Sequence, residues 1–225
     1  GAYVHGVRSG IAEAHAAKAG VLAAAGDYGA AERELAVAMR LDPDSVDVMQ
    51  EAARLHFMLK RYEKAAASWD RYATLVETDI ASGGLLITCY TALGDRANVK
   101  RVAQRTMARA EKAVATDADN GSAMATIFSC LLCLGEPERA KDWARRAVLI
   151  DPDNLGMRYN LACDFVVAIH DHDMALEMLR PVCRNSGHEQ IAWIGSDPDM
   201  DPLRDDPRFK ELVAEAEARL ATAQP

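Results

Sequence analysis

The chain has 225 residues, of which half are hydrophobic and only 6% are aromatic, so close helix packing is favoured over a sheet core. Its net charge of −8 and its pI near 5.3 argue against a nucleic-acid partner and against an anionic membrane surface. No apolar run approaches the roughly 20 residues that cross a bilayer, and no signal peptide is visible.

Landmark residues recur along the chain with a period of 34. Gly26 recurs as Gly94 two periods later, and Ala31 recurs as Ala65 one period later. A period of about 34 with helical patterning predicts an array of antiparallel helix pairs, in which each helix A is followed by a helix B.

We therefore expect an all-α fold, a right-handed solenoid of five helix pairs that is closed by a C-terminal capping helix. The expected segments are a lead-in at 1–11, five units at 12–45, 46–79, 80–120, 121–154 and 155–184, and a linker with the capping helix at 185–225.

The first unit carries the signals that separate its two helices. Gly26 ends helix A, and Asp27 can cap helix B. Helix B ends at Asp42-Pro43, because the residue before a proline disfavours the α region. Small residues such as Ala31 fall where the two helices must approach closely.

Two later units depart from this pattern. In the third, the closing loop comes seven residues late, so helix B at about 96–116 is roughly two turns longer than its neighbours. In the fifth, Ala175 follows Ala140 by 35 residues, and we place the one extra residue in the loop at 170–173. Helix B of that unit is then expected at about 173–184.

Residues 185–225 leave the repeat. A turn at 185–187 precedes a short apolar piece around Trp193, and 197–207 is expected to be a loop with at most one helical turn. The pair Asp206-Pro207 can start a final helix at about 207–222. The apolar face of this helix would cover the last open unit of the solenoid.

These positions resemble the tetratricopeptide family over about 12–184. The second half also resembles the C-terminal repeat region of bacterial multidomain proteins that carry a class III adenylate/guanylate cyclase domain upstream. The segments that carry this second resemblance are LGEPERAKDWARRAVLIDPDN, MRYNLAC and the closing WIGSDPDMDPLRDDPRFKEL. Related tails also follow kinase or DNA-binding output domains. The resemblance implies a regulatory or scaffolding module of a signalling protein, and a parent chain that could itself be a nucleotide cyclase. The cytoplasmic location that we expect rests on the cysteines described below.

We predict no catalytic residue and no cofactor in this segment. A class III cyclase needs paired carboxylates on a strand-containing fold, and no convincing strand is present. Gly83-Gly84 lacks the lysine and serine of a phosphate-binding loop.

The aspartates at 197, 199 and 201 have the spacing that opens a calcium-binding EF-hand loop. Pro202 stands where that loop needs glycine, and Arg208 stands where it needs a bidentate glutamate. We therefore expect these aspartates to cap short turns beside prolines.

His170 and His172 flank Asp171 in an inter-helix loop and could begin a zinc site, although a solvated turn is the favoured interpretation. The pair Cys130-x-x-Cys133 has no second pair at zinc-ribbon spacing. We predict no metal. All the cysteines fall inside apolar helical runs and are expected to be reduced and packed in the core, namely Cys89, Cys130, Cys133, Cys163 and Cys183.

The concave face, which helix A lines in the tetratricopeptide family, is the expected binding site. The basic clamp that some members use for acidic C-terminal tails is absent, because Ala16, Gly20 and Leu85 stand at its positions. The remaining surface is mildly apolar and suited to a helix or an extended apolar peptide. The predicted groove residues are Gln50, Arg54, Ser129, Leu132, Tyr159, Asn160 and Val166.

We expect Tyr159 and Arg54 to be the main contacts of a protein or peptide partner, which could be another domain of the same parent chain. Two alternatives remain open from the sequence. The groove can be filled by the chain's own C-terminal tail, or the array can pair two copies in a homodimer.

Overall fold

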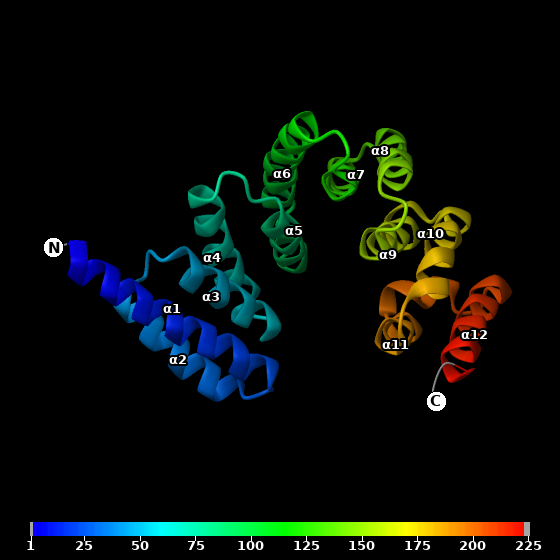
Figure 1. Ribbon diagram of the computed structural model, residues 1–225. Helices are drawn as coiled ribbons and strands as arrows, with labels where there is room; N and C mark the ends of the chain where they lie inside the picture. Colours follow the sequence, from blue (N-terminus) through cyan, green and yellow to red (C-terminus); the bar gives the residue numbers. More distant parts are fainter. Residues whose placement is uncertain (1, 223–225) are drawn as a thin grey trace. The chain divides into compact units, whose positions relative to one another are not determined.

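The computed structural model describes residues 2–222, and no strand occurs among them (Figure 1). The all-α solenoid architecture is confirmed. The contacts divide the chain into two compact units, unit 1 at 1–105 and unit 2 at 106–225, which are described separately below. None of the described helices is both long enough and apolar enough to cross a membrane.

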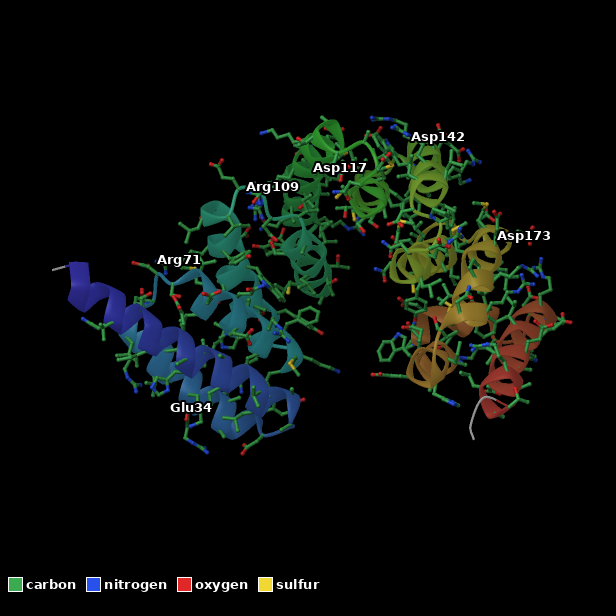
Figure 2. All side chains as sticks on the ribbon, viewed as in Figure 1. Glu34, Arg71, Arg109, Asp117, Asp142 and Asp173 are labelled. Carbon is green, nitrogen blue, oxygen red and sulfur yellow. The ribbon has the colours of Figure 1, made fainter. Side chains whose placement is uncertain are left out.

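Unit 1 is built from consecutive antiparallel helix pairs. Glu34 on the second helix accepts hydrogen bonds from His15 and Lys18 on the first, both at 2.6 Å (Figure 2). The last helix of the unit continues into unit 2. The helices are α1 (Ala2–Ala24), α2 (Tyr28–Leu41), α3 (Val46–Met58), α4 (Tyr62–Leu75), α5 (Ala81–Ala92) and α6 (Arg96–Thr116).

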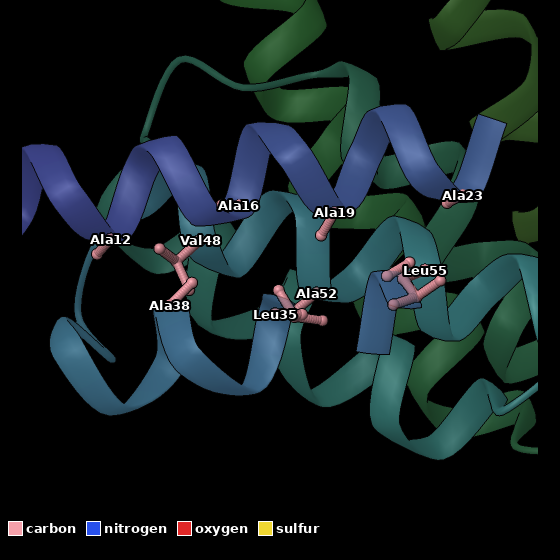
Figure 3. Packing of buried hydrophobic residues seen from close by; sticks show 10 residues of the cluster. Ala12, Ala16, Ala19, Ala23, Leu35, Ala38, Val48, Ala52 and Leu55 are labelled. Carbon is pink, nitrogen blue, oxygen red and sulfur yellow. The ribbon is translucent and has the colours of Figure 1, made fainter. Parts of the chain in front are cut away.

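The core of the first pairs is made largely of alanine. Ala12, Ala16, Ala19 and Ala23 recur every three or four residues along α1, so they form one stripe that faces α2 and α3 (Figure 3). Since alanine side chains end at Cβ, the helices can approach closely. Residues 2–11, which we set apart as a lead-in, are the first part of the continuous helix α1.

In each of the first five helix pairs, the loop from helix A to helix B contains one residue with positive φ. Glycine fills this position at Gly26, Gly94 and Gly135, with φ between 71° and 83°. Lys60 and His170 take the same place with φ of 55° and 58°, which is unusual for residues with a Cβ. The glycine landmark is therefore missing from the second and fifth loops although the backbone turn is kept.

Unit 2 continues the pairs and ends in the chain's C-terminal helix. The second half of α6 belongs to this unit, and its full length of 21 residues against 14 for α2 and α4 confirms the predicted longer helix. The other elements are α7 (Gly121–Leu134), α8 (Pro137–Ile150), α9 (Leu155–Asp164), the π-helical segment η1 (Phe165–Ile169), α10 (His172–Asn185), α11 (His188–Ser196), the 3₁₀ segment η2 (Pro198–Leu203) and α12 (Pro207–Thr222).

The extra residue of the fifth pair lies in the helix and not in the loop, so our placement at 170–173 was wrong. The loop between η1 and α10 is two residues long, which is also the length of the loop between α7 and α8. The chain instead widens into a π-helical turn, in which the His170 N–H bonds to the Phe165 carbonyl. This turn keeps both Phe165 and Val166 fully buried, and Phe165 packs on Phe128 of α7 with ring centroids 5.2 Å apart.

The C-terminal segment follows the period more closely than the sequence indicated. Helix α11 begins 33 residues after α9, and α12 begins 35 residues after α10. The final helix was predicted, whereas α11 was expected only as a short apolar piece. Phe209, Leu212, Ala216 and Leu220 are the buried residues of α12, which packs on α10 and α11. The tail thus forms a sixth helix pair with η2 inserted between its two helices.

We predict that Ala140→Leu lowers the free energy of unfolding by about 1–3 kcal/mol, because Ala140 has 0% exposure where α8 packs on α7 and has no room for a larger side chain. Glu138→Leu on the same helix is the control, since the Glu138 side chain is 84% exposed. Urea denaturation of both variants checks the prediction. Equal midpoints for the two variants would contradict the assigned helix faces.

Candidate functional site

In unit 1, the predicted groove residues Gln50 and Arg54 lie exposed on α3. The Arg54 guanidinium donates a hydrogen bond to Glu51 at 3.0 Å. The Glu51 carboxylate rests on Gly20 of α1, where a Cβ would lie only 2.7 Å from it. The hollow between α1 and α3 beside Arg54 measures about 40 Å³, which is near the volume of one water molecule. It is too small to receive a peptide side chain.

In unit 2, the structure brings Ser129 and Asn160 together. They line a hollow of about 230 Å³ between α7 and α9, which we call the α7–α9 hollow. Its other lining residues are neutral, namely Ser122, Ala125, Thr126, Met157 and Leu161. Leu132, further along α7, is half-buried.

A larger hollow of about 800 Å³ lies between Tyr159 and the first two turns of α11, and we call it the α11 hollow. Trp193 lines it and is 56% exposed, and His188 and Glu189 on the same helix are exposed as well. We expected Trp193 only as part of a short apolar piece, so this surface was not predicted. The available signal was a large aromatic residue beside polar ones in a short helical piece.

Tyr159 and Val166 do not have the accessibility that we predicted for groove residues. Val166 has 0% exposure inside the π-helical turn, so it belongs to the core. Tyr159 has 9% exposure, and its hydroxyl donates a hydrogen bond to Asp197 of the tail. The chain's own tail therefore binds the Tyr159 hydroxyl, and little of this side chain is left to line the α11 hollow.

Acidic side chains gather where the tail meets α9. The Ser129 hydroxyl donates to Asp164 at 2.6 Å, and the Asp199 N–H donates to the Asp197 carboxylate at 2.9 Å. Burial raises the pKa of Asp164, and the nearby Asp199 carboxylate raises it further. Burial and the neighbouring Asp197 likewise raise the pKa of Asp199. We call Asp164, Asp197 and Asp199 the carboxylate cluster.

The thiol of Cys163 and the carboxylates of Asp197 and Asp199 have donor atoms within 4.8 Å of one another. These three groups are the described residues that come closest to a metal-ligand set. Burial raises the pKa of the Cys163 thiol to about 12, so it is protonated at neutral pH. The oxygens of Asp197 already accept hydrogen bonds from Tyr159 and from the Asp199 backbone. The donor set is therefore poorly prepared for a metal ion.

The other clusters from the sequence have structural roles. Asp201, which shares the EF-hand spacing, pairs with Arg204 at 2.5 Å. The His170 ring donates to the Val166 carbonyl at 3.1 Å, and the Asp171 side chain caps α10 by accepting from the Met174 N–H.

The paired cysteines on α7 lie in or beside the core. Cys130 is buried and Cys133 half-buried, and burial raises the pKa of the Cys130 thiol to about 12. Neither thiol has the low pKa of a reactive cysteine.

Apart from the Asp201–Arg204 pair beside η2, the ion pairs described here in unit 2 involve the B helices. Asp142 on α8 pairs with Arg145 at 3.0 Å, and Asp173 on α10 pairs with Arg208 at 2.7 Å (Figure 2). By contrast, the hollows are lined by helices α7, α9 and α11, which occupy the A positions. The two sides of the unit thus differ in chemistry.

Comparisons with known proteins agree with this architecture. The tetratricopeptide repeat family matches residues 22–73, a segment that runs from the end of α1 into α4. The solved structure of pilF from Pseudomonas aeruginosa is 11% identical and superposes with a TM-score of 0.57, covering 97% of this chain and 94% of that one. No curated protein has a significant match to the chain.

Two further solved structures have the same fold. A thermophilic tetratricopeptide-repeat protein of Thermus thermophilus is 18% identical, with a TM-score of 0.54 over 92% of this chain and 99% of that one. The MamA protein is 14% identical, with a TM-score of 0.51 over 86% of this chain and 97% of that one. At these identities the likeness concerns the fold alone.

We predict that Asp164→Asn stabilises the protein at pH 7 by on the order of 1 kcal/mol, because it removes a charge that burial and Asp199 disfavour. The raised pKa of Asp164 means that protonation favours the folded state below the ordinary aspartate pKa, and that this contribution is lost as the pH rises through the raised value. The difference in the free energy of unfolding between Asp164→Asn and the unchanged protein should therefore vanish near pH 4.

Urea denaturation at both pH values checks this expectation. The control is Asp142→Asn on α8, since the Asp142 side chain is 74% exposed and should change stability little at either pH. If Asp164→Asn destabilises the protein equally at pH 7 and pH 4, the ionised Asp164 carboxylate stabilises the fold and our account of it is wrong.

Proposed function

We propose that the chain is a non-catalytic protein-interaction scaffold that binds a segment of another protein along the A-helix side of unit 2. A protein-interaction role in general follows from the tetratricopeptide fold. The single observation that supports this particular surface is the pair of hollows that meet on α9, where Tyr159 lines one and its neighbour Asn160 lines the other.

The sizes and linings of the hollows suit peptide side chains. The α11 hollow of about 800 Å³ lies within the range of ordinary ligand pockets. The α7–α9 hollow is smaller and has a neutral lining of small, polar and apolar residues. An extended segment that crosses α9 would reach both hollows, with side chains pointing alternately along its length.

The contacts in this proposal differ from those expected from the sequence. Tyr159 has only 9% exposure, and Arg54 is paired with Glu51 beside a hollow of about 40 Å³. Trp193 and Asn160 are the better anchors, since Trp193 is 56% exposed and Asn160 is exposed on α9. Tryptophan is among the residues that most often dominate binding energy at interfaces.

We further propose that the chain is the regulatory module of a bacterial signalling protein. The support for this context is the resemblance of LGEPERAKDWARRAVLIDPDN and of the closing WIGSDPDMDPLRDDPRFKEL to cyclase-associated repeat regions. In that setting the bound segment belongs to another domain of the parent chain or to a separate protein.

The test is a selection of random phage-displayed peptides of about 12 residues, which extended reach roughly 40 Å, against the intact chain. We expect binders whose affinity falls at least about tenfold on Trp193→Ala, the loss typical of an interface anchor. Asn160→Arg should also weaken them by filling the α7–α9 hollow with a long side chain. The control is Trp143→Ala on α8, where the ring packs under Arg146 at 4.3 Å and faces neither hollow.

A selection that yields no binder, or binders that ignore both groove variants, would overturn the proposal. Light scattering of the same proteins measures their mass in solution and so tests the homodimer alternative. A dimer that dissociates on Trp193→Ala would make this surface an interface between two copies of the chain.

A further inference from the structure

We propose that the segment bound by unit 2 is cationic, with a lysine or arginine side chain that lies on Trp193 and is held by Glu189, in the negative potential of the carboxylate cluster. This inference rests on the proposed function and adds the chemistry of the partner to it.

The charge of the surface is the first argument. Helices α7 and α11 and segments η1 and η2 contain no lysine and no arginine, whereas they carry Glu189, Asp199 and Asp201. The one basic residue of α9 is Arg158, which is buried and donates to the Pro152 carbonyl at 2.6 Å. Glu189 therefore lines the α11 hollow together with no lysine or arginine, and His188 is the one lining residue there of a basic type.

The second argument is that the carboxylate cluster lacks a cationic partner within the described residues. The ion pairs of the described chain include none to Asp164, Asp197 or Asp199. Arg204, the nearest arginine in sequence, pairs with Asp201 and donates to the backbone carbonyl of Asp197, not to a carboxylate of the cluster.

Asp70 in unit 1 is a partly buried carboxylate whose charge is neutralised by arginines of the same chain. Burial alone would raise the pKa of Asp70, but hydrogen bonds from Arg101, Tyr90 and Arg105 bring it below its ordinary value. The two arginines lie 2.6 and 3.0 Å from the carboxylate. The carboxylate cluster has no such arginines among the described residues, so its negative charge would attract a cationic segment to this side of unit 2.

The third argument concerns Trp193 and Glu189. They lie four residues apart on α11, so they share one face of that helix, and both line the α11 hollow. A cationic side chain stacked on the Trp193 ring would have the Glu189 carboxylate within reach. The same kind of contact already occurs elsewhere in unit 2, where Arg146 lies 4.3 Å from the centroid of the Trp143 ring.

A divalent metal ion is the competing occupant of the carboxylate cluster. The protonated thiol of Cys163 and the hydrogen bonds already accepted by Asp197 disfavour it. A peptide cation also gains the contact with Trp193, which a metal ion bound at Cys163 would not make. The observations therefore favour a peptide side chain.

The test uses the phage-displayed random peptides and considers only binders that depend on Trp193. We expect lysine and arginine to be enriched and acidic residues depleted relative to the unselected library. Replacing the basic residues of a selected peptide by glutamine should weaken its binding at least about tenfold. Glu189→Gln should weaken binding about three- to tenfold, and the loss should shrink at high salt.

The matched control is Glu217→Gln on α12, because Glu217 is exposed and lines neither hollow. This variant should bind the peptides as the unchanged protein does.

The outcomes separate this inference from the proposed function. Binders that depend on Trp193 but are neutral or acidic would overturn the cationic partner and leave the scaffold proposal standing. A selection without binders that depend on Trp193 would overturn both. Zinc binding that is lost on Asp199→Asn, together with peptide binding that is unaffected by Glu189→Gln, would assign the cluster to a metal ion instead.

Discussion

The close approach of helices at alanine positions is the constraint on which the rest of this structure depends. Ala31, Ala65, Ala140 and Ala175 all have 0% exposure where one helix of a pair crosses its neighbour. With side chains this small, a pair buries little apolar surface by itself and needs the next pair to complete its core. The array therefore cannot simply stop, and each of its ends needs an element that covers the last apolar face.

The tail of unit 2 provides such an end and, in doing so, creates the candidate binding surface. Helix α12 covers α10, while α11 continues the row of A helices beside α9. The Tyr159 hydroxyl donates a hydrogen bond to Asp197, so the tail takes up the polar group that we expected to face a partner. The large exposed aromatic side chain on this side of unit 2 is therefore Trp193 on α11 and not Tyr159 on α9. The same segment thus closes the core and forms the site.

Much of this fold could be predicted from the sequence, because local signals mark it. Positive-φ glycines, capping aspartates and the period of 34 placed most helices, including the long α6. The extra residue of the fifth pair could not be placed, since an insertion gives the same spacing whether it lies in a loop or in a π-helical turn. The burial of Tyr159 also escaped prediction, because its partner Asp197 lies 38 residues away. A site formed by such contacts depends on tertiary packing that the repeat pattern does not encode.

Hydrogen exchange of the intact chain at neutral pH tests most directly the claim that the tail is an integral helix pair of unit 2. Because α12 buries Phe209, Leu212, Ala216 and Leu220 against α10 and α11, its amides should open only together with those of α10. The account predicts similar protection for the amides of α10, α11 and α12. Tail amides that exchange at the rate of an unstructured chain, while α9 and α10 stay protected, would contradict it.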